Sequence, residues 1–295
     1  MFLRRLPKFE YHAPASVAEA QGLMTKYGSE ARFIAGGTDL LIAMKKREAA
    51  PGRLISLGNI AALKGIADDG SGGVQIGALT TLGEIERSPI VRKGALALCD
   101  AVEVMGSAQV RSLATIGGNL CSGVPSADTA PPLIALKAAL KLVGPAGERQ
   151  VPVEQFFTGP KETVRKADEI LAAILIPKPE APSAGCYLKL MRRHAMDLAL
   201  VGVAAWLKLD GGKKVCVEAR IALGAVAPTP IRVAEVEALL VNKTIDAGVV
   251  AEAARIAGMQ CRPISDVRAS LEYRCSMVEV LTRRAVTEAH RRIIG

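Results

Sequence analysis

The chain has 295 residues, half of them hydrophobic, which is enough for two domains and a large core. Only 3% of the residues are aromatic, so the core must be built mainly from Ala, Leu, Ile and Val. The net charge of +9 is spread over small basic groups without interleaved aromatic residues, which argues against a nucleic-acid-binding protein.

The sequence also argues against a membrane or secreted protein. No uninterrupted apolar run reaches the roughly 18 residues that a bilayer span requires. The opening residues Met1–Pro7 carry positive charge without an apolar segment behind them, so we expect no signal peptide. The six cysteines form no C-x-x-C pair, which is typical of free thiols in a reducing compartment. We therefore expect a cytoplasmic protein; Cys121, which follows a glycine segment, is a lone thiol and cannot hold an iron–sulfur cluster by itself.

The first 59 residues predict alternating strands and helices. Ser16–Glu19 has the pattern of a capping box, in which both side chains satisfy free N–H groups where a helix begins. Arg32–Ala35 has the composition of a short strand, and Thr38 or Asp39 can cap the helix that follows. Leu54–Leu57 is the next strand candidate.

A second unit begins near residue 60. Val74–Ala78 alternates weakly like a strand, Thr81–Glu84 is another capping box, and Val91–Val104 has helical periodicity. A proline pair predicts a helix over Leu133–Leu140, because Pro is tolerated in the first turn. Further strands are expected at 141–143, 150–151 and 170–176.

Pro177–Ser183 is the clearest linker in the sequence. After it, strand-like segments at 185–191, 199–209 and 215–224 precede helical segments at 232–240, 246–258 and 270–291. Strands followed by helices predict a compact α+β domain at the C-terminal end.

Two glycine segments, Ala35–Asp39 and Thr115–Asn119, are the most informative part of the chain. Paired glycines let the backbone approach a ligand closely, because they carry no Cβ. Successive N–H groups in such turns form an anion site that suits a pyrophosphate. Two such segments predict one extended, phosphate-bearing ligand held from both sides.

These segments resemble the flavin-binding loops of a known family. The chain is similar to the FAD-binding (medium) subunits of the molybdenum hydroxylase and xanthine dehydrogenase family, such as those of carbon monoxide dehydrogenase and 4-hydroxybenzoyl-CoA reductase. The resemblance covers nearly the whole chain and is carried by Phe33–Leu40, Gln109–Arg111, Thr115–Asn119, Ser126–Asp128, Pro263–Ser270 and Tyr273–Arg274. The cysteine-rich loop of the 4-hydroxybenzoyl-CoA reductases is missing after Asn119, so we expect no cluster in this subunit.

The resemblance implies an α+β architecture with a vanillyl-alcohol-oxidase-type (PCMH-type) FAD-binding fold. Two α/β subdomains, about 1–59 and 60–177, would make the FAD-binding domain 1–177, and 184–292 would form a C-terminal α+β domain like that of CO dehydrogenase flavoproteins. FAD would lie extended between the subdomains. It would be bound non-covalently, because the three histidines lie outside both glycine segments.

The resemblance also implies which positions bind FAD. The pyrophosphate and the neighbouring flavin edge would be wrapped by Arg32, Phe33, Ile34, Ala35, Gly36, Gly37, Thr38 and Asp39. The diphosphate and adenosine side would be contacted by Thr115, Ile116, Gly117, Gly118 and Asn119. Asp128 would accept hydrogen bonds from a hydroxylated part of FAD, and Leu171 would touch the isoalloxazine. Lys189 would lie near the flavin ring, and Met105 falls where xanthine dehydrogenases place an aromatic residue.

Two of these residues have plain alternatives. Asp128 precedes the Pro-led helix, so its side chain can instead be an N-cap. Lys189 can be an ordinary surface lysine; beside the flavin, its charge would favour the negatively charged reduced ring.

The function implied by the resemblance is electron transfer, with no catalytic residue or metal ligand in this chain. A molybdenum cofactor on a large partner subunit and [2Fe-2S] clusters on a small one would exchange electrons with this FAD, which would serve an external acceptor. A dimer of heterotrimers is the assembly that the family implies. Two alternatives remain: a stand-alone FAD-dependent oxidoreductase of the same fold, and a nucleotide-binding module without redox function.

Overall fold

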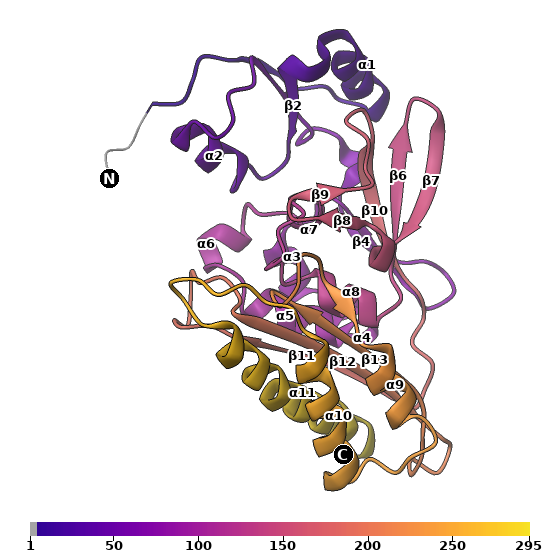
Figure 1. Ribbon diagram of the computed structural model, residues 1–295. Helices are drawn as coiled ribbons and strands as arrows, with labels where there is room; N and C mark the ends of the chain where they lie inside the picture. The colour runs from indigo at the N-terminus through magenta and orange to yellow at the C-terminus, as the bar shows by residue number, and fades with distance from the viewer. Residues whose placement is uncertain (1–4) are drawn as a thin grey trace.

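The computed structural model describes residues 5–295, so the expectation about a signal peptide at Met1–Pro7 falls largely outside the described residues. The three larger of the four sheets lie at successive levels, with the N-terminal sheet at the top of Figure 1 and the C-terminal sheet below. None of the helices in the described part is long and apolar enough to cross a membrane.

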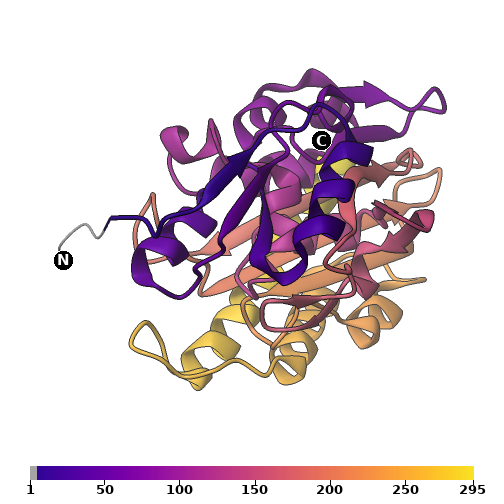
Figure 2. The same cartoon turned by 90° about the horizontal axis from the view of Figure 1, so that it is seen from above.

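The N-terminal sheet is parallel and has the order β1-β3-β2. Its strands are β1 (Glu10–His12), β2 (Ala31–Ile34) and β3 (Arg53–Ser56), and its connections carry α1 (Val17–Tyr27) and α2 (Leu40–Lys46). The strand–helix alternation predicted for this part is confirmed. Figure 2 views this layer from above, with the later sheets beneath it.

The helix starts predicted from capping patterns differ in detail. Ser16 Oγ accepts from the Glu19 N–H over 3.1 Å, but the Glu19 carboxylate accepts from Ala15 N–H (2.8 Å) instead of closing the box on Ser16. The Thr81–Glu84 box is complete, with both reciprocal hydrogen bonds present. Asp39 is the N-cap of α2 but makes no side-chain capping bond.

The middle sheet has five antiparallel strands in the order β4-β5-β10-β6-β7. They are β4 (Ile66–Asp68), β5 (Val74–Gly77), β10 (Ile170–Ile176), β6 (Ala139–Gly144) and β7 (Gly147–Pro152). The helices of this unit are α3 (Leu82–Arg87), α4 (Pro89–Gly94), α5 (Leu96–Glu103), α6 (Ala108–Arg111), α7 (Ile116–Cys121) and α8 (Ala130–Ala135). Short elements complete it: the hairpin β8 (Phe157–Gly159) with β9 (Glu162–Thr163), and 3-10 turns at Gly28–Glu30, Ala61–Leu63 and Val153–Gln155.

Two helix predictions in this unit are wrong in extent. The helix expected over Leu133–Leu140 spans only Ala130–Ala135, because Lys137 adopts a left-handed φ of 54° and the chain then enters β6. The helix expected over Val91–Val104 is two helices broken at Ala95, whose φ and ψ of −151° and 51° are not helical. Hydrophobic periodicity alone does not locate such breaks.

The C-terminal sheet is antiparallel and has the order β11-β12-β13-β14. Its strands are β11 (Ser183–Leu190), β12 (Val201–Leu209), β13 (Cys216–Gly224) and β14 (Ile231–Arg232). The helices that follow are α9 (Ala234–Leu240), α10 (Ala247–Gln260) and α11 (Leu271–Ile294). Figure 1 shows α10 and α11 beneath the sheet and α5 and α8 above it. The α+β arrangement predicted for this end of the chain, with strands first and helices after them, is therefore present.

The alternation of side chains along this sheet joins the two halves of the chain. Ala204 and Trp206 of β12 point into the core of the middle unit, whereas Val203 and Ala205 point into the core under α10 and α11. The sheet is therefore buried on both faces, and β11 is placed against the middle unit.

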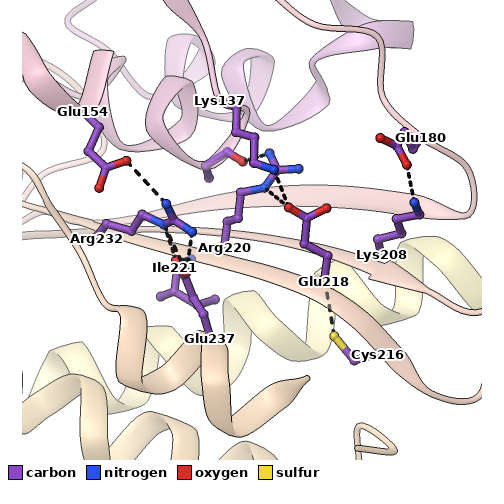
Figure 3. A network of polar contacts seen from close by, with 11 residues as sticks. Lys137, Glu154, Glu180, Lys208, Cys216, Glu218, Arg220, Ile221, Arg232 and Glu237 are labelled. Carbon is purple, nitrogen blue, oxygen red and sulfur yellow. Dashed lines mark hydrogen bonds and ion pairs between the residues drawn. The ribbon is translucent and has the colours of Figure 1, made fainter. Parts of the chain in front are cut away.

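A polar network crosses the same boundary (Figure 3). Arg220 of β13 is buried, donates to the Ala135 carbonyl over 2.6 Å and stacks 3.7 Å from the centre of the Trp206 ring. Lys137 reaches Glu218 over 2.6 Å. Because Ala135 and Lys137 flank the end of α8, these contacts fix α8, and the loop before it, against the C-terminal sheet.

Candidate functional site

The first glycine segment connects β2 to α2 and keeps its donors free. The backbone N–H groups of residues 36–39 donate no hydrogen bond to any described residue. Gly37 has a φ of +71°, a conformation that L side chains rarely adopt, so glycine is favoured here. Four consecutive unpaired N–H groups without obstructing side chains at Gly36 and Gly37 form the concave donor set that an anion needs.

The structure places this segment against the second one. A Cβ built on Gly36 would lie 1.9 Å from the Leu113 carbonyl oxygen and 3.1 Å from Ala114 Cα. Leu113 and Ala114 directly precede Thr115, so the two glycine segments adjoin although about 75 residues separate them. Because Gly36 has no Cβ, the backbone of Leu113 and Ala114 can pack closely against it. The sequence analysis explained this glycine only by the close approach of a ligand.

The second segment is not the open loop that the sequence predicted. Thr115 is the N-cap of α7, and its Oγ1 accepts from the Gly118 N–H over 3.1 Å. The N–H groups of Ile116 and Gly117 donate to the carbonyls of Thr80 (3.1 Å) and Ala78 (2.9 Å). The donors of residues 116–119 are therefore already paired within the protein, whereas those of residues 36–39 are not.

The second segment instead connects to the predicted carboxylate through side chains. Thr129 Oγ1 donates to Asn119 Oδ1 over 2.6 Å, which links α7 to the loop that carries Asp128. Thr129, and not Asp128, is the N-cap of α8, and Asp128 makes no capping bond. The alternative that Asp128 serves as a helix cap is therefore wrong.

Asp128 and Lys189 form a buried ion pair across the boundary between the two halves of the chain. Lys189 Nζ lies 2.9 Å from Asp128 Oδ2, and the two side chains are 1% and 7% exposed. The phenol of Tyr187, two positions earlier on the same face of β11, donates to Asp128 Oδ1 over 2.7 Å. The alternative of a surface lysine is wrong, and Tyr187 is a residue that the sequence reading missed.

Burial is the largest influence on the pKa values of Asp128 and Tyr187. It raises the pKa of Asp128, against the Lys189 ammonium and the hydrogen bond from Tyr187, which both lower it. Burial and the neighbouring carboxylate raise the pKa of Tyr187 well above its usual value, so the phenol keeps its proton and acts as a donor. The Asp128–Lys189 ion pair is therefore buried, away from water, between the two halves of the chain.

Lys189 has no donor left for a further partner. Besides Asp128, its ammonium donates to the carbonyls of Val104 (3.2 Å) and Asp197 (3.0 Å). These three acceptors come from three different segments. Lys189 therefore connects Val104, the residue before Met105, and Asp197, in the loop after β11, to the Asp128 carboxylate. A direct hydrogen bond from Lys189 to a flavin requires one of these bonds to break.

The remaining predicted positions are spread around this centre. Met105 is 8% exposed, and its carbonyl accepts from Arg111 over 2.9 Å. Leu171 on β10 is 4% exposed and packs into the middle core. Arg32 and Asp39 are exposed, while residues 33–38 are half-buried.

A groove of about 480 Å³ opens beside β11, lined by Asp100, Tyr187, Arg284, Glu288 and Arg292 among others. Arg292 donates to Asp100 over 2.7 Å and to Glu288 over 2.9 Å. Of the residues predicted to bind FAD, none lines it. The groove adjoins the Asp128–Lys189 pair, because it is lined by Tyr187 and Val104, which bond to these two residues.

The residues present fit an FAD diphosphate at the first glycine segment. The unpaired N–H groups of Gly36–Asp39 supply charge-assisted donors, worth roughly 1.5–3 kcal/mol each toward an ionised acceptor. The second segment adjoins these donors at Gly36 and is linked to the loop of Asp128 by the Thr129–Asn119 hydrogen bond.

Comparison with known proteins shows the family to which the chain belongs. Residues 7–179 match the family described as the FAD binding domain in molybdopterin dehydrogenase, and residues 186–289 match the CO dehydrogenase flavoprotein C-terminal domain. The carbon monoxide dehydrogenase medium chain of Hydrogenophaga pseudoflava is 37% identical over 96% of this chain and 97% of its own. A xanthine dehydrogenase FAD-binding subunit of Escherichia coli is 34% identical over 95% of each chain.

Solved structures match over the same extent. A chain of carbon monoxide dehydrogenase from Hydrogenophaga pseudoflava superimposes with a TM-score of 0.94 at 38% identity, covering 98% of this chain and 99% of that one. Quinoline 2-oxidoreductase from Pseudomonas putida gives 0.91 at 32% identity, with coverages of 97% and 98%. The predicted fold class is thereby confirmed.

Proposed function

Because the chain belongs to the family of FAD-binding subunits of molybdopterin dehydrogenases, we propose that it is the electron-transfer subunit of a multi-subunit molybdenum hydroxylase. It is an FAD-dependent oxidoreductase subunit. In the proposed complex it passes electrons between iron–sulfur clusters of a partner and an external acceptor. The observation that carries the proposal is the cradle of unpaired N–H groups at Gly36–Asp39, within a chain that matches medium subunits end to end.

Bound FAD supplies chemistry in both one-electron and two-electron steps, and the protein supplies position and electrostatics. The N–H groups of Gly36–Asp39 would hold the diphosphate, and the segment Thr115–Asn119 lies directly beside them. Asp128 has two further lone-pair directions that FAD hydroxyl groups would use, while Tyr187 and Lys189 hold its charge in place. Lys189 thus positions the Asp128 carboxylate and, through its bond to the Val104 carbonyl, the chain just before Met105.

The partners follow from the names of the relatives. Carbon monoxide dehydrogenase contains a medium chain like this one, so we propose a large subunit with a molybdenum cofactor, a small subunit with [2Fe-2S] clusters, and a dimer of such heterotrimers. The domain division 1–177 and 184–292 and a cytoplasmic location are part of the same proposal. Six free thiols accord with a reducing compartment.

The deciding experiment is purification of the tagged chain from its own cells, followed by a visible spectrum and mass measurement of every subunit that copurifies. Flavin bands with a broad iron–sulfur contribution, together with a large and a small partner, are the expected result. Flavin that bleaches reversibly with dithionite in the absence of any partner would instead indicate the stand-alone oxidoreductase. Failure to bind or reconstitute FAD would contradict the role of the glycine segments and point to a module without redox function.

A further inference from the structure

The C-terminal domain holds two thiols in direct contact. The Sγ atoms of Cys261 and Cys275 lie 2.9 Å apart, and the single S–H proton of Cys261 can point either to Cys275 Sγ or to the Gly258 carbonyl oxygen, 3.1 Å away. Cys261 is the C-cap of α10, and Cys275 lies in the second turn of α11. Disulfide sulfurs are about 2.05 Å apart, so an approach of about 0.9 Å would bring the pair to bonding distance.

The two thiols differ in their exposure to an oxidant: Cys275 is half-buried, whereas Cys261 is buried. Cys275 is half-buried and therefore reachable, and its sulfur lies 2.9 Å from the Cys261 sulfur. Cys261 is 4% exposed, and burial and the neighbouring Cys275 raise the pKa of its thiol to about 12. Cys275 is thus the sulfur that an oxidant meets, and Cys261 is the thiol held behind it.

The segment between the cysteines connects to the candidate site. Asp266 in this segment pairs with the buried Arg274 over 3.0 Å, and Arg274 donates to the Leu200 carbonyl over 2.7 Å. Leu200 ends the loop that begins after Lys189 and contains Asp197, whose carbonyl accepts from Lys189. Cys275 therefore lies next in sequence to a buried side chain that anchors this loop.

We propose that Cys261 and Cys275 form a reversible disulfide on exposure to a hydroperoxide, and that this bridge holds residues 262–274 against α11. The Cys275 thiolate attacks the peroxide, forms an S–O bond and releases hydroxide. The Cys261 sulfur then displaces the oxygen as water and forms the S–S bond. In total, two thiols and one H₂O₂ give one disulfide and two waters, and a dithiol reductant reverses the step.

The test uses the full-length protein with its copurifying subunits, treated with hydrogen peroxide and digested with trypsin without reduction. Cys261 and Cys275 fall in separate tryptic peptides, 256–268 and 275–283, because Arg262 precedes a proline and is not cleaved. The expected product joins the two peptides, is two hydrogens lighter than their sum, and disappears with dithiothreitol. Met259 and Met277 also take up oxygen, so the joined pair of peptides, not the added mass, identifies the bridge.

Two variants and one further measurement complete the test. Cys275→Ser abolishes the joined peptide, whereas Cys121→Ser, which removes the other half-buried thiol, leaves it unchanged. Hydrogen exchange of the peroxide-treated protein shows slower exchange across 262–274 that returns to the starting rate after reduction. A Cys275 sulfenic or sulfinic acid without the joined peptide, unreacted thiols, or pairing with another cysteine would each overturn the proposal.

Discussion

Lys189 of β11 donates to Asp128 Oδ2 over 2.9 Å and thereby joins the C-terminal sheet to the loop that leads into α8. Both side chains are removed from water, so each charge depends on the other. The pair also connects two residues that the family pattern assigned separately to FAD. Their contact shows that part of the proposed cofactor site is built by the packing of the two halves of the chain.

Removal of the ammonium should destabilise the protein strongly. Lys189→Met leaves the Asp128 carboxylate buried with one hydrogen bond, which should lower the free energy of unfolding by about 3–5 kcal/mol. The matched variant Lys208→Met, which breaks the partly exposed pair with Glu180, should cost about 1 kcal/mol or less. Urea unfolding followed by circular dichroism measures both. Equal effects of the two variants would contradict the buried-pair interpretation.

Tyr187→Phe isolates the phenol. The change removes one donor from Asp128 Oδ1 without creating a cavity, so we expect a loss of about 1–3 kcal/mol in unfolding free energy. The pKa of Asp128 should rise further, because a hydrogen bond that favours its charged form is gone. Tyr273→Phe at a 48% exposed position is the control and should change stability by less than about 0.5 kcal/mol. If both variants behave alike, Tyr187 has no role in holding the carboxylate.

Gly36→Ala tests the contact between the glycine segments. The added Cβ would lie 1.9 Å from the Leu113 carbonyl oxygen, so the two segments must separate, at a cost of about 1–3 kcal/mol in stability. We expect a lower FAD content per chain and weaker rebinding of FAD to the stripped protein. Gly22→Ala, on the exposed face of α1 with nothing within 4 Å of the new Cβ, should keep FAD and gain about 0.5–1 kcal/mol. Full FAD occupancy in Gly36→Ala would show that the spacing of the segments is not critical.

The end of α11 should contribute an acid-sensitive part of the stability. Hydrogen bonds from Arg291 and Arg292 lower the pKa of Glu288 to about 2 in the folded protein. A lowered folded pKa means that the contribution is present above the ordinary glutamate pKa of about 4.3 and is lost as the pH falls toward 2. Solvent screening should limit it to about 1 kcal/mol. Unfolding free energies of the wild type and Glu288→Gln, measured from pH 6 downward, should converge in acid, and a constant difference would contradict this assignment.

The sequence by itself determined the elements whose signals are local. Strand β10 was predicted at its observed bounds, and the Thr81–Glu84 box was read correctly, because alternation and capping depend on neighbouring residues. The glycine segments and their surroundings were sufficient to identify the family, because the backbone conformations and close approaches that they require admit few other residues.

The tertiary structure decided what depends on segments far apart in the chain. No local pattern shows that the N–H groups of Ile116 and Gly117 are bonded to the carbonyls of Thr80 and Ala78, since those bonds form only when α7 packs against the segment that follows β5. Tyr187 shares a strand face with Lys189, which period-two alternation could have indicated, but its partner Asp128 is 59 residues away. Lys189, which the sequence allowed to be a surface lysine, is buried in the fold and bonded to Asp128. Its burial could not be predicted locally, because desolvation depends on the folded chain and not on a residue's neighbours in sequence.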